Sequence, residues 1–261
     1  MTVFDPARRL LSMLGVAPHA RGTLKGSATK AWAVTETDWM KSLSDRDMQL
    51  MGQICPPRPF ARGERVFRHG DPAGCLYILL EGHVKLAQPT WLGGERVISV
   101  CGPDDFFGEN FLTGADQCLA DAVCLSEPTV VCPVSREQFL EVAARLPNVA
   151  LTFAMVLARR NADLEAKLHV MTQPVQIRLA RVMLELAARL GEEVGEGVYH
   201  LKIDLRHDEI ASMAGASRVS ATQAISAWRT QELVLGTRGD YRVNVPGLAK
   251  FIERLELEAL E

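Results

Sequence analysis

The sequence predicts an α+β protein with an antiparallel β-roll, of the double-stranded β-helix or jelly-roll type, before a helical C-terminal half. Three observations support this fold class. Residues 58–134 contain short apolar runs separated by turn residues, which is typical of antiparallel strands. Residues 148–171 contain no proline or glycine, which favours one long helix. Residues 207–245 combine a pair of short helices with a glycine-centred hairpin.

The composition limits the function classes. The chain has 261 residues, 48% of them hydrophobic, and a formal net charge of −3. This length fits two domains with real cores and excludes a disordered or collagen-like chain. No run approaches the roughly 18–20 apolar residues of a membrane span, so we expect no membrane partner and a cytoplasmic location. The charge excludes a general polycation but allows a local basic surface.

The six cysteines lack metal-site spacing, because no C-x-x-C pair and no following histidine pair occurs. We therefore expect no metal, and reduced, mostly buried thiols of a cytosolic protein in place of a disulfide scaffold. The positions are Cys55, Cys75, Cys101, Cys118, Cys124 and Cys132. A redox sensor among them is the alternative, and only Arg136 near Cys132 is a basic neighbour.

The N-terminal half divides into an extension, residues 1–37, and a β-roll domain, residues 38–147. In the extension, the broken apolar run favours an amphipathic helix over a targeting segment, and residues 20–35 form a polar link. Ser44 caps a short helix that ends at Pro56. The expected strands are 65–68, 76–80, 84–87, 96–100 and 129–134.

The long helix and its hinge occupy residues 148–173, after a capping box at Ser135–Gln138 and a shorter helix. A helix about 36 Å long either crosses a core or pairs with a second copy of itself. The apolar positions expected to form a dimer seam are Phe153, Val156, Leu157, Leu164, Leu168 and Met171. Pro174 then begins a helical C-terminal domain, residues 174–250, and residues 251–261 are expected to form a helical tail.

Residues 207–226 have the pattern of a helix-turn-helix. Ala211 allows a close helix crossing, Gly215 suits the tight turn, and Ser217 can cap the second helix. That helix would present Arg218, Ser220 and Gln223 to the major groove. Any helical hairpin with small residues at its crossing is the structural alternative.

The hairpin over residues 233–245 resembles the wing of a winged helix, and its arginines can contact phosphates or simply face solvent. Because the local charge is only weakly basic, DNA binding requires the neighbouring acids to lie on the far side. The expected DNA-contacting residues are Arg206, His207, Ser217, Arg218, Val219, Ser220, Gln223, Arg238 and Arg242.

Two N-terminal motifs carry a family resemblance. Residues 70–84, GDPAGCLYILLEGHV, resemble the opening of a cyclic-nucleotide-binding β-roll, and residues 102–109, GPDDFFGE, resemble its phosphate-binding cassette. With the helices behind them, residues 38–248 resemble a CRP/FNR-type transcription regulator. The resemblance implies a homodimer that activates transcription from a palindromic promoter site and recruits RNA polymerase. A two-fold axis would place the two recognition helices about 34 Å apart.

Departures from the family pattern bear on the effector. In cAMP-binding relatives an Arg-Ser pair holds the cyclic phosphate, and the matching residues here are Leu119 and Ala120. Relatives also contact adenine through hydroxyls on the long helix, and none occurs between Phe153 and Met171. We therefore expect no cAMP binding. Gly108 and Glu109 remain candidates for an effector pocket, although a sharp turn and a sheet-facing carboxylate also explain them.

Other cofactors are disfavoured as well. An iron–sulfur cluster needs an N-terminal cysteine cluster, and only Cys55 precedes the roll. His69 and His83 are the candidate haem ligands, but lone histidines at strand ends are usually surface residues. The leading hypothesis is a regulator with a lost or unfamiliar effector, and the alternative is gating by another small ligand or by a redox signal.

The recognition helix also departs from its relatives, which commonly place a glutamate after the arginine. Val219 can offer only an apolar contact, for instance to a thymine methyl, and Gln223 suits adenine. We expect a target that differs from the usual TGTGA-like half-site.

An enzyme is the rival class of protein, but no catalytic motif occurs in the sequence. A protein-interaction module would require residues 207–226 to face inward.

Overall fold

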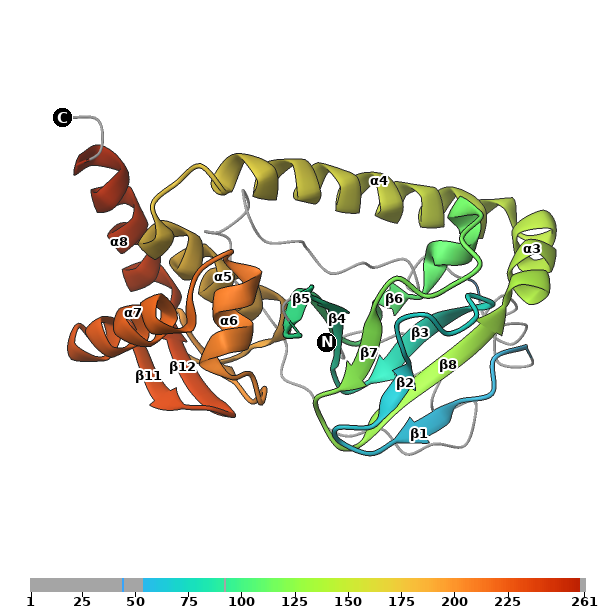
Figure 1. The fold of residues 1–261 in the computed structure, drawn as a ribbon, viewed down its shortest axis with the longest axis horizontal. Helices are drawn as coiled ribbons and strands as arrows, with labels where there is room; N and C mark the ends of the chain where they lie inside the picture. The colour runs from blue at the N-terminus through green and yellow to red at the C-terminus, as the bar shows by residue number, and fades with distance from the viewer. Residues whose placement is uncertain (1–43, 45–53, 92, 259–261) are drawn as a thin grey trace. The chain divides into compact units, whose positions relative to one another are not determined.

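The computed structural model describes residue 44 and residues 54–91 and 93–258 (Figure 1). The chain forms two compact units, and the division between them falls inside one helix, between Ala162 and Asp163. Each unit is described by itself. The extension expected over residues 1–37 and most of the short helix expected after Ser44 lie outside the described residues.

The first unit contains two four-stranded antiparallel sheets, which confirms the predicted β-roll. One sheet has the order β1 (Arg58–Phe60), β8 (Thr129–Ser135), β3 (Cys75–Glu81) and β6 (Phe106–Phe107). The other has the order β2 (Arg65–Phe67), β7 (Asp121–Cys124), β4 (Val84–Pro89) and β5 (Glu95–Cys101). The sequence pattern missed β1, β6 and β7, because strands of two to four residues carry almost no periodicity.

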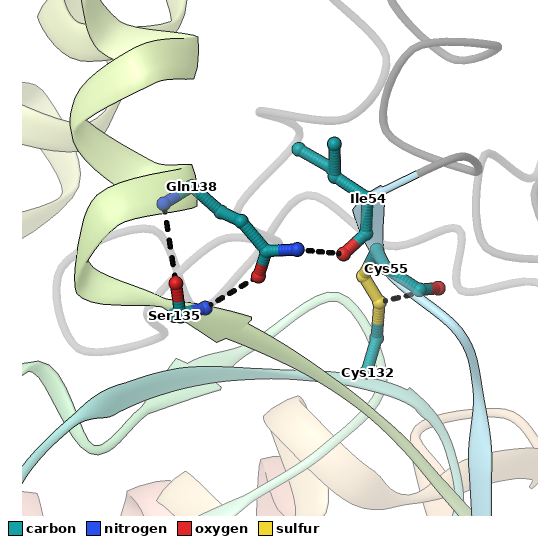
Figure 2. The surroundings of a disulfide bond; sticks show 5 residues. All are labelled: Ile54, Cys55, Cys132, Ser135 and Gln138. Carbon is teal, nitrogen blue, oxygen red and sulfur yellow. Dashed lines mark hydrogen bonds between the residues drawn. A yellow bond between two sulfur atoms is a disulfide. The ribbon is translucent and has the colours of Figure 1, made fainter.

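Among the described residues, the sheets of this unit are accompanied by η2 (Glu109–Thr113), α3 (Arg136–Arg145) and the first part of α4 (Pro147–Val170). The capping box at the start of α3 is present as predicted (Figure 2). Ser135 Oγ accepts from the Gln138 backbone N–H at 3.2 Å, and Gln138 Oε1 accepts from the Ser135 N–H at 2.8 Å. These bonds satisfy backbone donors that a helix start otherwise leaves free.

The core of the roll also fixes the first half of α4. Val149 and Val156 of α4 are buried in the same cluster as strand residues such as Ile78 and Cys132. Phe153 stacks on Phe106 with ring centroids 4.3 Å apart. Aromatic stacking and apolar burial together hold this part of the helix on the sheet.

The second unit is a winged helix. Its helices are α5 (Val175–Leu190), α6 (His207–Met213), α7 (Arg218–Thr230) and α8 (Val245–Glu258). Its sheet has the order β11 (Val234–Thr237), β12 (Asp240–Asn244), β10 (Val198–Leu201) and β9 (Glu192–Gly195). The β9–β10 hairpin was not predicted. The tail expected from residue 251 is not a separate segment, because α8 begins at Val245 and buries Leu248 and Ile252.

The cysteines correct one expectation. Cys55 and Cys132, both fully buried, form a disulfide between the segment before β1 and strand β8, with Cα atoms 5.3 Å apart (Figure 2). The expectation that all six thiols are reduced is therefore wrong for this pair, which lies 77 residues apart in the sequence. The remaining described cysteines are free thiols, and burial raises the pKa of Cys124 to about 11.

Within the described part of the chain, no single helix is long and apolar enough to span a membrane. The bent pair Arg136–Arg145 and Val149–Leu168 meets the length and composition criteria only when the two helices are taken together.

Candidate nucleic-acid interface

Helices α6 and α7 meet at a turn built from small residues, as predicted. Ala211 and Ala214 are 1% exposed, and Gly215 adopts a left-handed conformation with φ of 58°. Arg178 of α5 donates from Nη1 to the Gly215 carbonyl at 3.1 Å. A side chain at position 215 would be strained and would crowd this guanidinium, so the turn requires glycine.

Ser217 caps the recognition helix. Its Oγ accepts from the Ser220 backbone N–H at 3.1 Å and lies 2.9 Å from Ser220 Oγ. The cap satisfies one of the free donors at the start of α7 and fixes where the helix begins. It thereby determines which side chains stand on the first, exposed turn.

Helix α7 has one buried face and one exposed face. The buried face contains Ala221, Ala224, Ile225 and Trp228. Arg218, Val219 and Gln223 are exposed, and Val219 keeps 64% of its surface accessible although it is apolar. Ser220 is half-buried. Residues 207–226 therefore do not face inward, as the alternative of a protein-interaction module would require.

Thr222 belongs to the same exposed face and was missed by the sequence analysis. It lies three residues after Val219, and this helical spacing was the available signal. Its Oγ1 lies 3.0 Å from Nδ1 of His207, the first residue of α6. The contact joins the two helices beside the presented face.

The surroundings of His207 favour its neutral form. Its pKa is lowered by burial and by the nearby Arg229 and Arg218 guanidinium groups, while Asp208 acts in the opposite direction. An imidazole at this edge of the domain can donate or accept a hydrogen bond at neutral pH without adding a positive charge. Arg206 precedes it, and its backbone N–H donates to Glu209 Oε2 at 2.7 Å, which secures the start of α6.

The wing is fastened to the helices by arginines. Arg229, in the last turn of α7, donates from Nη2 to the Gly236 carbonyl of β11 at 2.6 Å. Arg238 forms a two-pronged ion pair with Asp204, so the acids do not all lie on the far side as expected. Arg242 is exposed on β12. Of the two wing arginines, Arg238 thus has its charge matched by a neighbour in its own domain.

The cassette of the roll is organised around a guanidinium that the sequence analysis did not identify. Arg160 of α4 donates from Nη1 to Glu109 Oε1 at 3.1 Å and from Nη2 to the Phe106 carbonyl at 2.6 Å. It also lies over the Phe106 ring, 4.1 Å from the centroid. Glu109 therefore faces an arginine of α4, which replaces the expected sheet-facing arrangement. No local pattern signals a pairing across 51 residues.

Gly108 has a structural explanation. Its φ is 83°, and a Cβ there would lie 2.7 Å from Tyr77 Cδ2. Leu119, on the segment before β7, is 50% exposed, and Ala120 beside it is half-buried. Neither residue carries a charge or a hydroxyl for a phosphate. Of the four expected pocket residues, Glu109 thus gains a cationic partner, Arg160, which the tertiary fold brings to it.

The residues expected to form a dimer seam separate into two groups. Val156 is 7% exposed and is buried in the core of its own roll, so its assignment to the seam is wrong. Phe153 and Leu157 are only partly buried against that core. Leu164 and Leu168 are 55% and 72% exposed, and Met171 is 36% exposed. The apolar spacing of α4 combined two different faces of the helix.

An antiparallel roll followed by a long helix and a winged helix-turn-helix with a polar, exposed recognition face defines a DNA-binding regulator of transcription. The family model of the cyclic nucleotide-binding domain matches residues 57–145, and the family model of the Crp-like helix-turn-helix domain matches residues 177–253.

Sequence and structure comparisons agree with these matches. The chain is 32% identical to the cyclic AMP receptor protein of Thermus thermophilus over 194 residues, which cover 74% of this chain and 85% of that protein. It is also 32% identical to the CRP-like cAMP-activated global transcriptional regulator of Mycobacterium tuberculosis, over 65% of this chain and 75% of that protein. A crystal structure of a CRP/FNR-family regulator from Thermus thermophilus aligns with TM-score 0.57 and 26% identity, covering 76% and 98% of the two chains. The chain belongs to the CRP/FNR family of transcription regulators.

Proposed function

We propose that the chain acts as a homodimer that binds a two-fold symmetric promoter site, with α7 of each copy in the major groove. The observation that supports this best is the exposed face of α7, where Arg218, Val219 and Gln223 stand opposite a fully packed inner face. Arginine and glutamine carry the donors and acceptors that read guanine and adenine edges, and valine can contact a thymine methyl. Ser217, Ser220, Arg206, His207 and Arg242 would contact the backbone.

The test begins with selection of bound sequences from random DNA. The expected product is a palindrome whose half-site differs from TGTGA, because Val219 cannot accept a hydrogen bond from cytosine. Arg218→Ala should then weaken binding to the selected site by about 1–3 kcal/mol, or roughly 5- to 150-fold. Ser226→Ala, exposed further along α7, is the matched control and should bind normally. Recovery of an unchanged TGTGA half-site would contradict the specificity argument.

We further propose that DNA binding does not depend on cAMP, although two relatives carry cAMP in their names. Leu119 and Ala120 provide neither a charge nor a hydroxyl, and Glu109 already has an intrachain partner in Arg160. Titration calorimetry should show no binding of cAMP, and the affinity for the selected DNA should be the same with and without it. Saturable cAMP binding that tightens DNA binding would overturn this part of the proposal.

We propose activation through RNA polymerase as the regulatory outcome, with the chain acting in the cytoplasm and without catalysis of its own. Run-off transcription with purified polymerase tests this directly. A template carrying the selected site upstream of a weak promoter should yield more transcript when the protein is added. The Arg218→Ala protein should fail to raise it. Lower transcript with the parent protein would indicate a repressor.

Redox gating is the second candidate, and the Cys55–Cys132 disulfide favours it. Cys132 Sγ also lies 3.1 Å from the Cys55 carbonyl, so a reduced thiol would find an acceptor there (Figure 2). Affinity for the selected DNA should be compared for oxidised protein, reduced protein and Cys55→Ser. A several-fold difference between oxidised and reduced protein, with Cys55→Ser fixed at the reduced value, would favour gating. Equal affinities would leave the bond a purely structural one.

A further inference from the structure

The wing of the second unit carries an arginine at its tip. Strands β11 and β12 pair as far as Thr237 and Asp240, so Arg238 and Gly239 form the two-residue turn between them. Gly239 adopts a left-handed conformation with φ of 82°, which suits such a turn. A guanidinium can bind a phosphate through two parallel hydrogen bonds. By its residue type alone, the wing tip is therefore a candidate to bind the DNA backbone.

An acid of the same unit already binds this guanidinium. Arg238 donates from Nη2 to Asp204 Oδ2 at 3.0 Å and from Nε to Asp204 Oδ1. The Asp204 side chain is 17% exposed, whereas that of Arg238 is 55% exposed. Because a paired guanidinium and carboxylate carry no net charge, the wing tip attracts phosphates much less than an arginine by itself would.

The backbone holds the Asp204 carboxylate in its place. Asp204 lies on the segment between β10 and α6, where the Leu205 N–H donates to the Ile203 carbonyl at 2.9 Å. This bond closes a three-residue γ-turn with Asp204 at its centre. The residues on either side, Ile203 and Leu205, are 3% and 2% exposed. The carboxylate therefore cannot leave the wing by a movement of its backbone unless two core residues unpack.

We infer that Asp204 withholds Arg238 from the DNA backbone and so limits binding that does not depend on sequence. A phosphate and a carboxylate offer a guanidinium the same pair of oxygen acceptors, so DNA must displace Asp204 to gain this contact. Displacement would take the cation away from a largely buried carboxylate, which is unfavourable. Phosphate contacts add affinity for any DNA sequence. Suppression of this contact makes binding depend more on the bases that α7 contacts.

The inference rests on the DNA binding proposed above and adds a residue outside the recognition helix. The wing also provides a matched control in Asp240, two residues from Arg238. Its Oδ1 lies 2.5 Å from His200 Nε2, so this acid has a different partner. Asp240→Asn removes one negative charge from the same hairpin, as Asp204→Asn removes one beside it. Only Asp204→Asn releases the arginine.

The test measures affinity for the selected site and for unrelated DNA between roughly 50 and 200 mM salt. Asp204→Asn should bind both DNAs several-fold more tightly at the low end of this range. The slope of log affinity against log salt should steepen by about 0.9 for each released arginine, or about 1.8 for a dimer. Asp240→Asn should leave the slope unchanged. In an Arg238→Gln background, Asp204→Asn should no longer steepen it.

A second measurement needs no substitution at Asp204. In the parent chain labelled with nitrogen-15 arginine, the Nε–H resonance of Arg238 is identified by its loss in Arg238→Gln. It should stay near its position when the selected DNA is added, because Arg238 remains on Asp204. A large displacement of this resonance, or an unchanged salt slope for Asp204→Asn, would overturn the role of Asp204 and leave the proposed DNA binding standing. A parent chain that selects no DNA sequence would overturn the proposed function and this inference with it.

Discussion

Ser217→Ala tests whether the cap of α7 controls the recognition helix. The substitution removes the acceptor for the Ser220 backbone N–H, which lies 3.1 Å away, and the contact with Ser220 Oγ at 2.9 Å. Loss of a serine cap costs about 1 kcal/mol. For a domain of 60–100 residues, this lowers the melting temperature by roughly 4–8 °C. The same change inside the helix, Ser226→Ala, should instead stabilise by about 0.5 kcal/mol, because alanine is the better helix former.

The assay uses the fluorescence of Trp228, which is 1% exposed and packs edge-on against Phe251. Its emission reports unfolding of the second unit when Trp32, Trp39 and Trp91 are replaced by phenylalanine. Trp91 is already 93% exposed, so its replacement should be neutral. Equal melting temperatures for the two serine variants would refute the capping argument.

Three further predictions concern the roll and the pH response. Gly108→Ala should destabilise the roll by about 2–4 kcal/mol, because alanine there would be strained by the left-handed backbone and crowded by its neighbours. Gly63→Ala meets no neighbouring atom, so only the backbone strain of about 1–2 kcal/mol should remain. Calorimetric melting of the two variants measures the difference. Arg160→Met should cost about 1–3 kcal/mol, and a double-mutant cycle with Glu109→Gln in urea should be non-additive; strict additivity would exclude the pair. Because the pKa of folded His207 is lowered, the unfolded chain takes up the proton more readily. The second unit should therefore lose stability as pH falls through about 6.5. Thermal melts at several pH values should show a smaller loss for His207→Gln than for the parent protein.

The cassette illustrates how a site can keep its framework while its chemistry changes. Gly108 is required by its φ and by the neighbouring tyrosine ring, so its presence says nothing about a ligand. Glu109 is paired with Arg160, which also binds the Phe106 carbonyl and ring. One guanidinium therefore ties the long helix to the roll through three contacts. This arrangement is compatible with a roll that serves mainly as a scaffold for α4.

The elements that the sequence predicted well have strong local causes. Short apolar runs bounded by turn residues identified β3, β4, β5 and β8, and the absence of glycine and proline identified α4. The capping box at Ser135 and the cap at Ser217 were readable because each involves residues three positions apart. The family was predicted from the resemblance of residues 70–84 and 102–109 to known motifs, together with the long helix and the helix-turn-helix pattern that follow them.

The sequence by itself thus determined the β-roll, the long helix, the winged helix-turn-helix and most of the face that α7 presents. Only the tertiary structure decided which side chains meet across long stretches of chain. It paired Cys55 with Cys132, Arg160 with Glu109 and Arg238 with Asp204. It also buried Val156 in the core of the roll. The physical reason is that helix and strand patterns arise from contacts a few residues apart, whereas these partners are brought together by chain packing that no local period records.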